Sequence, residues 1–244
     1  MTAPQLGTLT WVPAAERPDL LGAPVAAALP RLAGPVWVAA IDEDLADTAA
    51  FTEAYDVPPS ASANCVVVAA RRGGETTMAA CLVLATTRAD VNGLVRRHLG
   101  ARKASFAPQD VAVAESGMAY GGITPIGLPD SWPMLVDAAV AAGELLVVGS
   151  GTRGSKLAVP GQVLAQLPGA VVLEGLGQPL ATPAGAGAPV GASAEGPAAA
   201  EPAPLPRPYR APDDSDIGWG ERPPDPGEAD RRYLENRPPH WGRD

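Results

Sequence analysis

The segment CVVVAARRGGETTMAACLVLA constrains the fold more than any other part of the sequence. Two apolar runs flank a Gly-Gly pair at 73–74, and glycine accepts the positive φ that a two-residue hairpin turn requires. The segment therefore predicts a β-hairpin in which Arg72 faces Glu75. In that register Cys65 and Cys81 point to opposite faces of the sheet, because side chains alternate along a strand. A disulfide between them is disfavoured, and we interpret both as small buried residues.

Further strands and short helices alternate along the chain up to about residue 180. They lack a strict βαβ rhythm, which argues against a doubly wound Rossmann fold. We therefore predict a single α/β (α+β) domain with a mixed twisted β-sheet or partial barrel flanked by short helices. The other predicted strands lie in 36–41, 132–140 and 144–159, and the predicted helices lie in 45–55, 90–100, 108–117 and 160–168.

Composition divides the chain into four predicted parts. Residues 1–34 form an N-terminal extension with a short helix, and residues 35–180 form the folded domain. Residues 181–212 are rich in Ala, Pro and Gly, a composition that cannot bury a core and predicts a disordered linker. Residues 213–244 form an acidic tail that contains Trp and Tyr. The tail is either disordered or docks on its own domain or on a protein partner.

Charge and apolar patterning exclude several classes of function. The formal net charge of -9 opposes a general coat for DNA or RNA, whose affinity would come from neutralising phosphates. It does not exclude a local pocket for a tRNA end. No apolar run approaches about 18 residues and no signal peptide is recognisable, so we expect a cytoplasmic protein without membrane association. The two cysteines lack metal-ligand spacing, and we expect neither a metal nor a cofactor.

Two glycine-rich motifs could carry chemistry. In GGITPIGLP, residues 121–129, the glycines permit a tight backbone path and the prolines stiffen the loop, which suits the wall of a small-molecule pocket. In VGSGTRGSKL, residues 148–157, a strand leads into a Gly-rich turn whose backbone N–H groups could hold a phosphate, carboxylate or ester oxygen. This GxG pattern alone is more typical of a plain tight turn, because it fits neither the dinucleotide nor the Walker fingerprint.

In order along the chain, KASFAPQDVAVAESG, GGITPIGLP, MLVDAAV and VVGSGTRGSKL resemble the signature run of the YbaK/EbsC-type family. This family is related to the editing domain inserted in bacterial prolyl-tRNA synthetases. The resemblance covers about residues 42–176. It implies metal-free hydrolysis of the ester that joins an amino acid to the terminal ribose of tRNA, so the implied partner is the aminoacyl-tRNA 3′ end.

The resemblance also implies roles for individual residues. The loop at 121–129 would shape the amino-acid pocket, the GxG loop would contact the aminoacyl or ribose end, and Asp137 occupies the family's acidic position. From the residues alone, Asp137 could equally be a strand-end cap or a loop anchor. The implied substrate-binding residues are Gly121, Gly122, Ile123, Thr124, Pro125, Gly127 and Asp137, and the implied catalytic residues are Asn64, Gly149, Ser150 and Gly151.

One position departs from the family pattern. Where the family carries its characteristic lysine, in a pattern like AKSLVF, this chain reads ANCVVV and has Asn64. Asparagine can donate a hydrogen bond but carries no charge, and losing one such electrostatic donor typically costs a factor of about 10² to 10³ in rate. Two hypotheses follow. The chain is a trans-acting aminoacyl-tRNA deacylase in which Asn64, the loop N–H groups and the substrate's ribose hydroxyl activate a water, or it is a catalytically weakened or inactive binding module.

Overall fold

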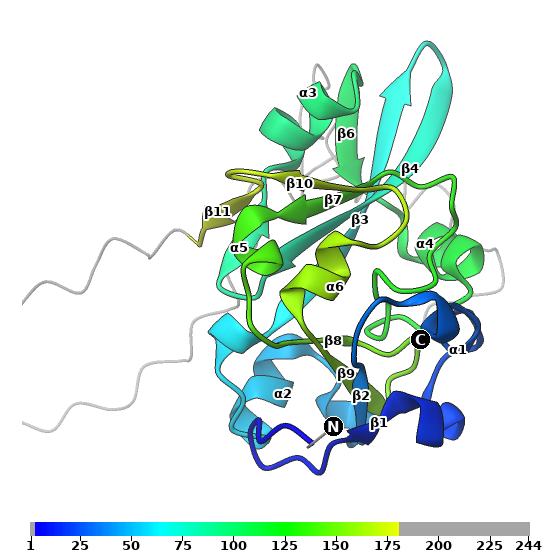
Figure 1. Ribbon diagram of the computed structural model, residues 1–244. Coiled ribbons are helices and arrows are strands. Elements are labelled where there is room, and N and C mark those ends of the chain that lie inside the picture. The colour runs from blue at the N-terminus through cyan, green and yellow to red at the C-terminus, as the bar shows by residue number, and fades with distance from the viewer. Residues whose placement is uncertain (1–2, 181–244) are drawn as a thin grey trace, which may run out of the picture. The chain divides into compact units, whose positions relative to one another are not determined.

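Strands β3 (Ala63–Arg72) and β4 (Glu75–Leu84) pair antiparallel and form the centre of the largest sheet in the computed structural model, which describes residues 3–180 (Figure 1). Arg72 pairs with Glu75, as the Gly-Gly turn predicts. Cys65 packs against one hydrophobic cluster and Cys81 belongs to another, and both thiols are free. The predicted hairpin, its register and the opposite orientation of the cysteines are therefore confirmed.

The described strands form three sheets. The five-stranded sheet has the order β10-β7-β4-β3-β6 and is mixed, because β7 runs parallel to both β4 and β10. A four-stranded antiparallel sheet has the order β1-β2-β9-β8, and β11 pairs with β5. The predicted mixed α/β architecture is confirmed, and the described strands do not close into a barrel. The remaining strands are β1 (Val12–Pro13), β2 (Trp37–Ala40), β5 (Thr87–Ala89), β6 (Lys103–Phe106), β7 (Met134–Asp137), β8 (Leu146–Gly149), β9 (Ser155–Val159), β10 (Ala170–Leu173) and β11 (Gly177–Pro179).

Short helices cover the sheets, and their ends follow the capping residues. Asp90 accepts hydrogen bonds from the N–H groups of Gly93 and Leu94, and Gly117 ends α4 in the left-handed conformation, with φ 66°. The α-helices are α1 (Ala23–Ala28), α2 (Thr48–Ala54), α3 (Arg96–His98), α4 (Gln109–Ser116), α5 (Ala138–Ala141) and α6 (Gly161–Ala165). A π-helical turn covers Val91–Val95, and 3-10 turns cover Ala14–Glu16, Pro18–Leu20, Leu29–Arg31, Glu43–Leu45 and Pro59–Ala61.

One strand prediction needs correction. The strand predicted over 132–140 ends at Asp137, and α5 follows it directly. The carboxylate of Asp137 accepts a hydrogen bond from the N–H of Ala139 at 2.9 Å and so starts the helix. Apolar residues such as Val140 continue the pattern but face the core from a helix, which a short apolar run cannot distinguish from a strand.

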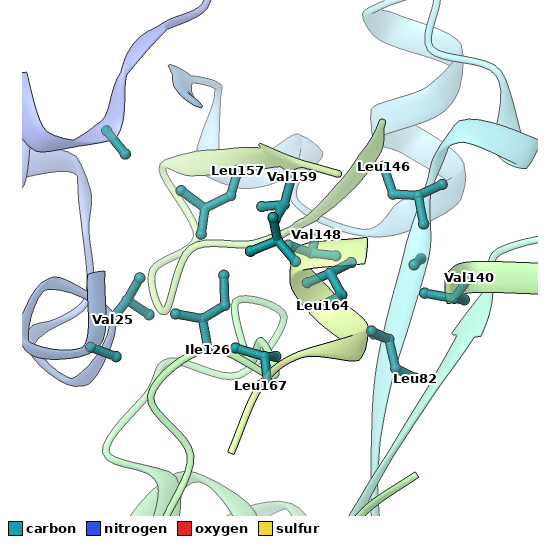
Figure 2. Close-up of a cluster of buried hydrophobic side chains, with 14 of the residues drawn as sticks. Val25, Leu82, Ile126, Val140, Leu146, Val148, Leu157, Val159, Leu164 and Leu167 are labelled. Carbon is teal, nitrogen blue, oxygen red and sulfur yellow. The ribbon is translucent and has the colours of Figure 1, made fainter. Parts of the chain in front are cut away.

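Aliphatic side chains from both larger sheets fill the main core (Figure 2). Leu82 of β4, Val148 of β8 and Leu157 of β9 meet there, and Val25 of α1 is also fully buried in this cluster. The segment before residue 35, predicted as an extension, therefore contributes to the core. The backbone of Ser62, just before β3, bridges to Val147 of β8 and joins the two sheets at one point.

The predictions of a linker and of an acidic tail are not tested, because residues 181–244 lie outside the described residues. Within residues 3–180, none of the helices is long and apolar enough to cross a membrane.

Candidate functional site

A cavity of about 490 Å³ opens where the start of β3 faces the four-stranded sheet. Its walls come from α2 and the residues just before it, the first half of β3, the end of β6, the start of α4, the loop before Ile123, the end of β8 and one residue of β9. This size lies in the range of small-molecule sites. The polar side chains that line it are Asp47, Thr48, Ser62, Asn64, Cys65, Gln109, Tyr120 and Lys156.

Asn64 lies in this cavity on β3 and has a defined orientation. The hydroxyl of Thr48, at the start of α2, donates to Asn64 Oδ1 at 2.7 Å. The opposite end of the amide, Nδ2, therefore remains as a donor. A nearby hydroxyl, that of Ser62, is buried and has no hydrogen-bond partner among the described residues. Buried polar groups are normally satisfied, so an unpartnered hydroxyl in a cavity wall is consistent with a ligand site.

The two glycine-rich loops meet at the cavity, but only part of each lines it. Gly121 and Ile123 of the first loop and Gly149 of the second are lining residues. Pro125 and Gly127 line a separate, much smaller cavity, and Thr124 is fully buried with an unpartnered hydroxyl. Within the motif 121–129, only Gly121 and Ile123 therefore line this cavity.

Backbone contacts between glycines hold the loops together. The N–H of Gly151 donates to the carbonyl oxygen of Gly122 at 2.8 Å. A Cβ on Gly122 would lie 2.3 Å from Thr152 O, and one on Gly149 would lie 2.4 Å from Gly122 O. Gly122 and Gly151 do not line the cavity themselves, and the N–H of Gly151 is already used. They fix the position of the cavity wall.

Ser150 is directed away from the cavity. Its side chain is fully buried and donates to the carbonyl oxygen of Ser155 at 2.9 Å, while the Ser155 hydroxyl donates to the Leu20 carbonyl oxygen. The backbone carbonyl of Ser150 accepts a hydrogen bond from the N–H of Gly22. The structure thus gives Ser150 the role of tying the GxG loop to the N-terminal segment.

Asp137 also lies outside the residues that line the cavity. Oδ1 caps α5, and Oδ2 accepts from the N–H of Gly177 at 2.7 Å, so it anchors β11 as well. These contacts correspond to the cap and anchor alternative that the sequence leaves open.

Replacing Asp137 with alanine is expected to lower the free energy of unfolding by about 2 kcal/mol, because a helix cap is lost and the Gly177 N–H loses its acceptor. Urea denaturation of the full chain would measure this, with Asp137→Asn, which keeps one acceptor, expected to lose less. The Michaelis constant for any substrate should stay within twofold of wild type. A large increase in that constant without loss of stability would restore the predicted substrate-binding role.

Lys156 is the residue that the sequence reasoning missed. It lies on β9 opposite Gly149, is only 7% exposed, and lines the cavity together with Ala46 and Phe51. Nζ donates to the carbonyl oxygen of Ala46 at 2.6 Å and lies 5.4 Å from the ring centroid of Phe51. The pKa of Lys156 is lowered to about 8, mainly by burial; the charge of Asp47 opposes this shift, and the charge of Arg153 adds to it.

Cys65 is the other reactive group in the cavity wall. Burial and the neighbouring Cys81 raise the pKa of its thiol above the ordinary range. The thiolate is the nucleophilic form of cysteine, so Cys65 is poorly suited to attack an ester at neutral pH.

The structure is an α/β domain with a cavity of small-molecule size between two sheets. A family model described as the aminoacyl-tRNA editing domain matches residues 42–167, and the chain belongs to this family. The resemblance to the YbaK/EbsC type is thereby confirmed. Among the residues that the structure describes, no group of three His, Cys, Asp or Glu could hold a metal ion.

Solved structures share this fold. One is the crystal structure of a proposed trans-editing enzyme for prolyl-tRNA synthetase, 20% identical, which covers 67% of this chain and 96% of its own at a TM-score of 0.53. Another, from work on computational epitope grafting, is 20% identical and covers 63% and 95%, also at 0.53. A third, a hypothetical protein, is 18% identical and covers 58% and 90% at 0.52.

Proposed function

We propose that this protein hydrolyses the ester bond of mischarged tRNA in trans. Membership of the editing-domain family supports this activity. The single observation that carries it is the convergence of Asn64 with both glycine-rich loops, through Gly121 and Gly149, on one cavity. Residues far apart in the sequence thus form one site of a size that suits an aminoacyl group and a ribose.

Ester hydrolysis needs donors placed where negative charge develops. Water attacks the carbonyl carbon, the carbonyl oxygen becomes an oxyanion, and collapse releases the ribose oxygen with a proton from the water. Asn64 Nδ2 is a donor in the cavity wall, held by the bond from Thr48 to its oxygen. A donor fixed in advance stabilises the oxyanion without further reorganisation. The ribose hydroxyl next to the ester is within the substrate itself and can relay the proton.

Two exposed aromatic side chains suit the nucleotide end of the substrate. Phe106 is 68% exposed and Tyr120 is 55% exposed, and both border the cavity. Unpaired RNA bases stack on such rings, at about 1–3 kcal/mol per base. We infer that the terminal adenine of the tRNA stacks here while its aminoacyl group enters the cavity.

The second candidate function is an inactive binding module of the same fold. It is favoured by Asn64 itself, because the residue at the family's lysine position carries no charge. Such a module would bind the aminoacyl end of tRNA and protect or present it without cleaving the ester.

A panel of tRNAs, each charged with a wrong amino acid, separates the two functions. Purified full-length wild type is expected to release amino acid from at least one of them, and Asn64→Ala is expected to slow that release at least tenfold. Lys103→Met, a substitution on the exposed face of β6, is the matched control with wild-type rate. Absence of turnover by wild type on every tRNA, with turnover appearing in Asn64→Lys, would establish the binding module instead.

A further inference from the structure

The ammonium of Lys156 is buried without a carboxylate partner. No ion pair of Lys156 with the described residues is found, and the nearby carboxylate of Asp47 lies 3.9 Å from Arg153 instead. Burying a charge is expensive unless it is paired. A fold that retains such a group in a cavity therefore invites a functional explanation.

The hydrogen bonds of Lys156 leave donors for a ligand. An ammonium has three N–H groups, and the bond to Ala46 O uses one of them. The described residues provide no acceptor for the other two. The Phe51 ring, 5.4 Å away, stabilises the cation but accepts no conventional hydrogen bond. Two donors of this buried cation are thus free for a ligand in the cavity that Lys156 lines.

Lys156 and Asn64 enter the cavity from different sheets. Asn64 lies at the start of β3, and Lys156 lies on β9 beside the GxG loop, where β9 pairs with Gly149. The two side chains line one cavity, so an ester group bound between them can be reached by a neutral donor from one sheet and a charged donor from the other. The position where the family pattern has a lysine and the position where this chain has one therefore line the same cavity.

We propose that Lys156 is a catalytic residue of this site, and that its ammonium donates to the ester carbonyl oxygen and stabilises the oxyanion formed there. The inference rests on the proposed deacylase activity. As water adds to the carbonyl carbon, the π electron pair moves to the oxygen that Lys156 contacts. The bond from that carbon to the ribose oxygen then breaks, one water proton goes to the ribose oxygen, and the other leaves with the acid. Lys156 remains protonated throughout.

Removing the ammonium at Lys156 on β9 and introducing one at Asn64 on β3 tests the catalytic role of Lys156. The probe is the mischarged tRNA that wild type cleaves fastest, and the four proteins are wild type, Lys156→Met, Asn64→Lys, and the double variant Asn64→Lys/Lys156→Met. Lys156→Met is expected to lower kcat by a factor of about 10² to 10³ with little change in KM. The double variant is expected to recover at least tenfold over Lys156→Met. Asn64→Lys alone should not exceed wild type, because two ammonium groups would then repel in one cavity.

The pH profile separates catalysis from a structural role. Because the pKa of Lys156 lies at about 8, the wild-type kcat, corrected for uncatalysed hydrolysis, should fall as the pH rises through that value. Lys156→Arg keeps its charge and its residual activity should not fall there. A Lys156→Met protein that melts at or above the temperature of wild type and of Lys103→Met would show that its loss of activity is not a loss of folding.

The possible results separate the role of Lys156 from the deacylase activity on which it rests. A Lys156→Met protein within threefold of an active wild type overturns the role of Lys156 and leaves the deacylase activity standing. A large loss in Lys156→Met without recovery in the double variant, together with a pH profile shared by wild type and Lys156→Arg, also overturns it. A wild type inactive on every tRNA overturns both.

Discussion

Replacing Gly122 with alanine is expected to lower the free energy of unfolding of the full chain by about 3 kcal/mol, at the upper end of the usual cost of overpacking. The new Cβ would lie 2.3 Å from the carbonyl oxygen of Thr152 and 2.8 Å from its nitrogen. Both are backbone atoms, so no side-chain rotation can relieve the clash. The loop at 150–154 would have to move, and with it the hydrogen bond from the N–H of Gly151 to Gly122 O.

Gly154→Ala is the matched control for this variant. Gly154 lies in the loop that Gly122 contacts, but a Cβ there would meet only the side chain of Glu43, at 3.3 Å or more. That side chain is flexible, so a change within about 0.5 kcal/mol is expected, as for an ordinary surface substitution. Urea denaturation with a common slope would measure both variants. Similar midpoints for the two would show that the loops are not locked together by close backbone approach.

The sequence predicted the hairpin better than any other element, for a local reason. The Gly-Gly turn fixes the register, and side-chain alternation then places both cysteines. The junction at Asp137 was predicted less well. A strand that leads into a helix of four residues leaves one continuous apolar run, and only the hydrogen bond to the Ala139 N–H reveals the boundary.

The sequence motifs predicted which loops contribute to the candidate site, but not which residues of each loop line the cavity. Gly149 and Gly151 share one motif, yet Gly149 lines the cavity and Gly151 packs on Gly22 of the N-terminal segment. That contact joins residues about 130 positions apart, which no local pattern encodes. Lys156 was overlooked for a similar reason. Its one sequence signal is a lone lysine in the buried strand SKLAV, and the cavity that it lines exists only after both sheets have assembled.

Lys156→Met is expected to remove a penalty from the folded state. Burial lowers the pKa of Lys156 from its ordinary value of 10.5 to about 8. Below pH 8 the lysine is protonated in both states, so wild type bears the full cost of burying the charge. Between about pH 8 and 10.5 the unfolded chain binds more protons than the folded one, and stability rises with pH. One pKa unit corresponds to about 1.4 kcal/mol, so the rise attributable to Lys156 is about 3 kcal/mol.

The two cysteines act in the opposite direction and must be separated from Lys156. Burial raises the pKa of Cys81 to about 12 and raises that of Cys65 as well. Above about pH 9 the unfolded thiols lose protons that the folded ones keep, which lowers stability. The cysteines are present in both proteins, so the difference between wild type and Lys156→Met isolates the lysine.

Denaturant titrations of both proteins from pH 7 to pH 10 would measure this difference. At pH 7 the variant is expected to be at least as stable as wild type, because methionine fills the stem's space without a buried charge, and its advantage should shrink as the pH rises. A variant that is less stable by a constant amount at every pH would show that folding does not shift the pKa of Lys156 and that the contacts of this side chain, such as its bond to Ala46 O, stabilise the fold. A variant that is more stable but slower in deacylation would mean that the chain retains Lys156 at a cost in stability. Functional groups often carry such a cost.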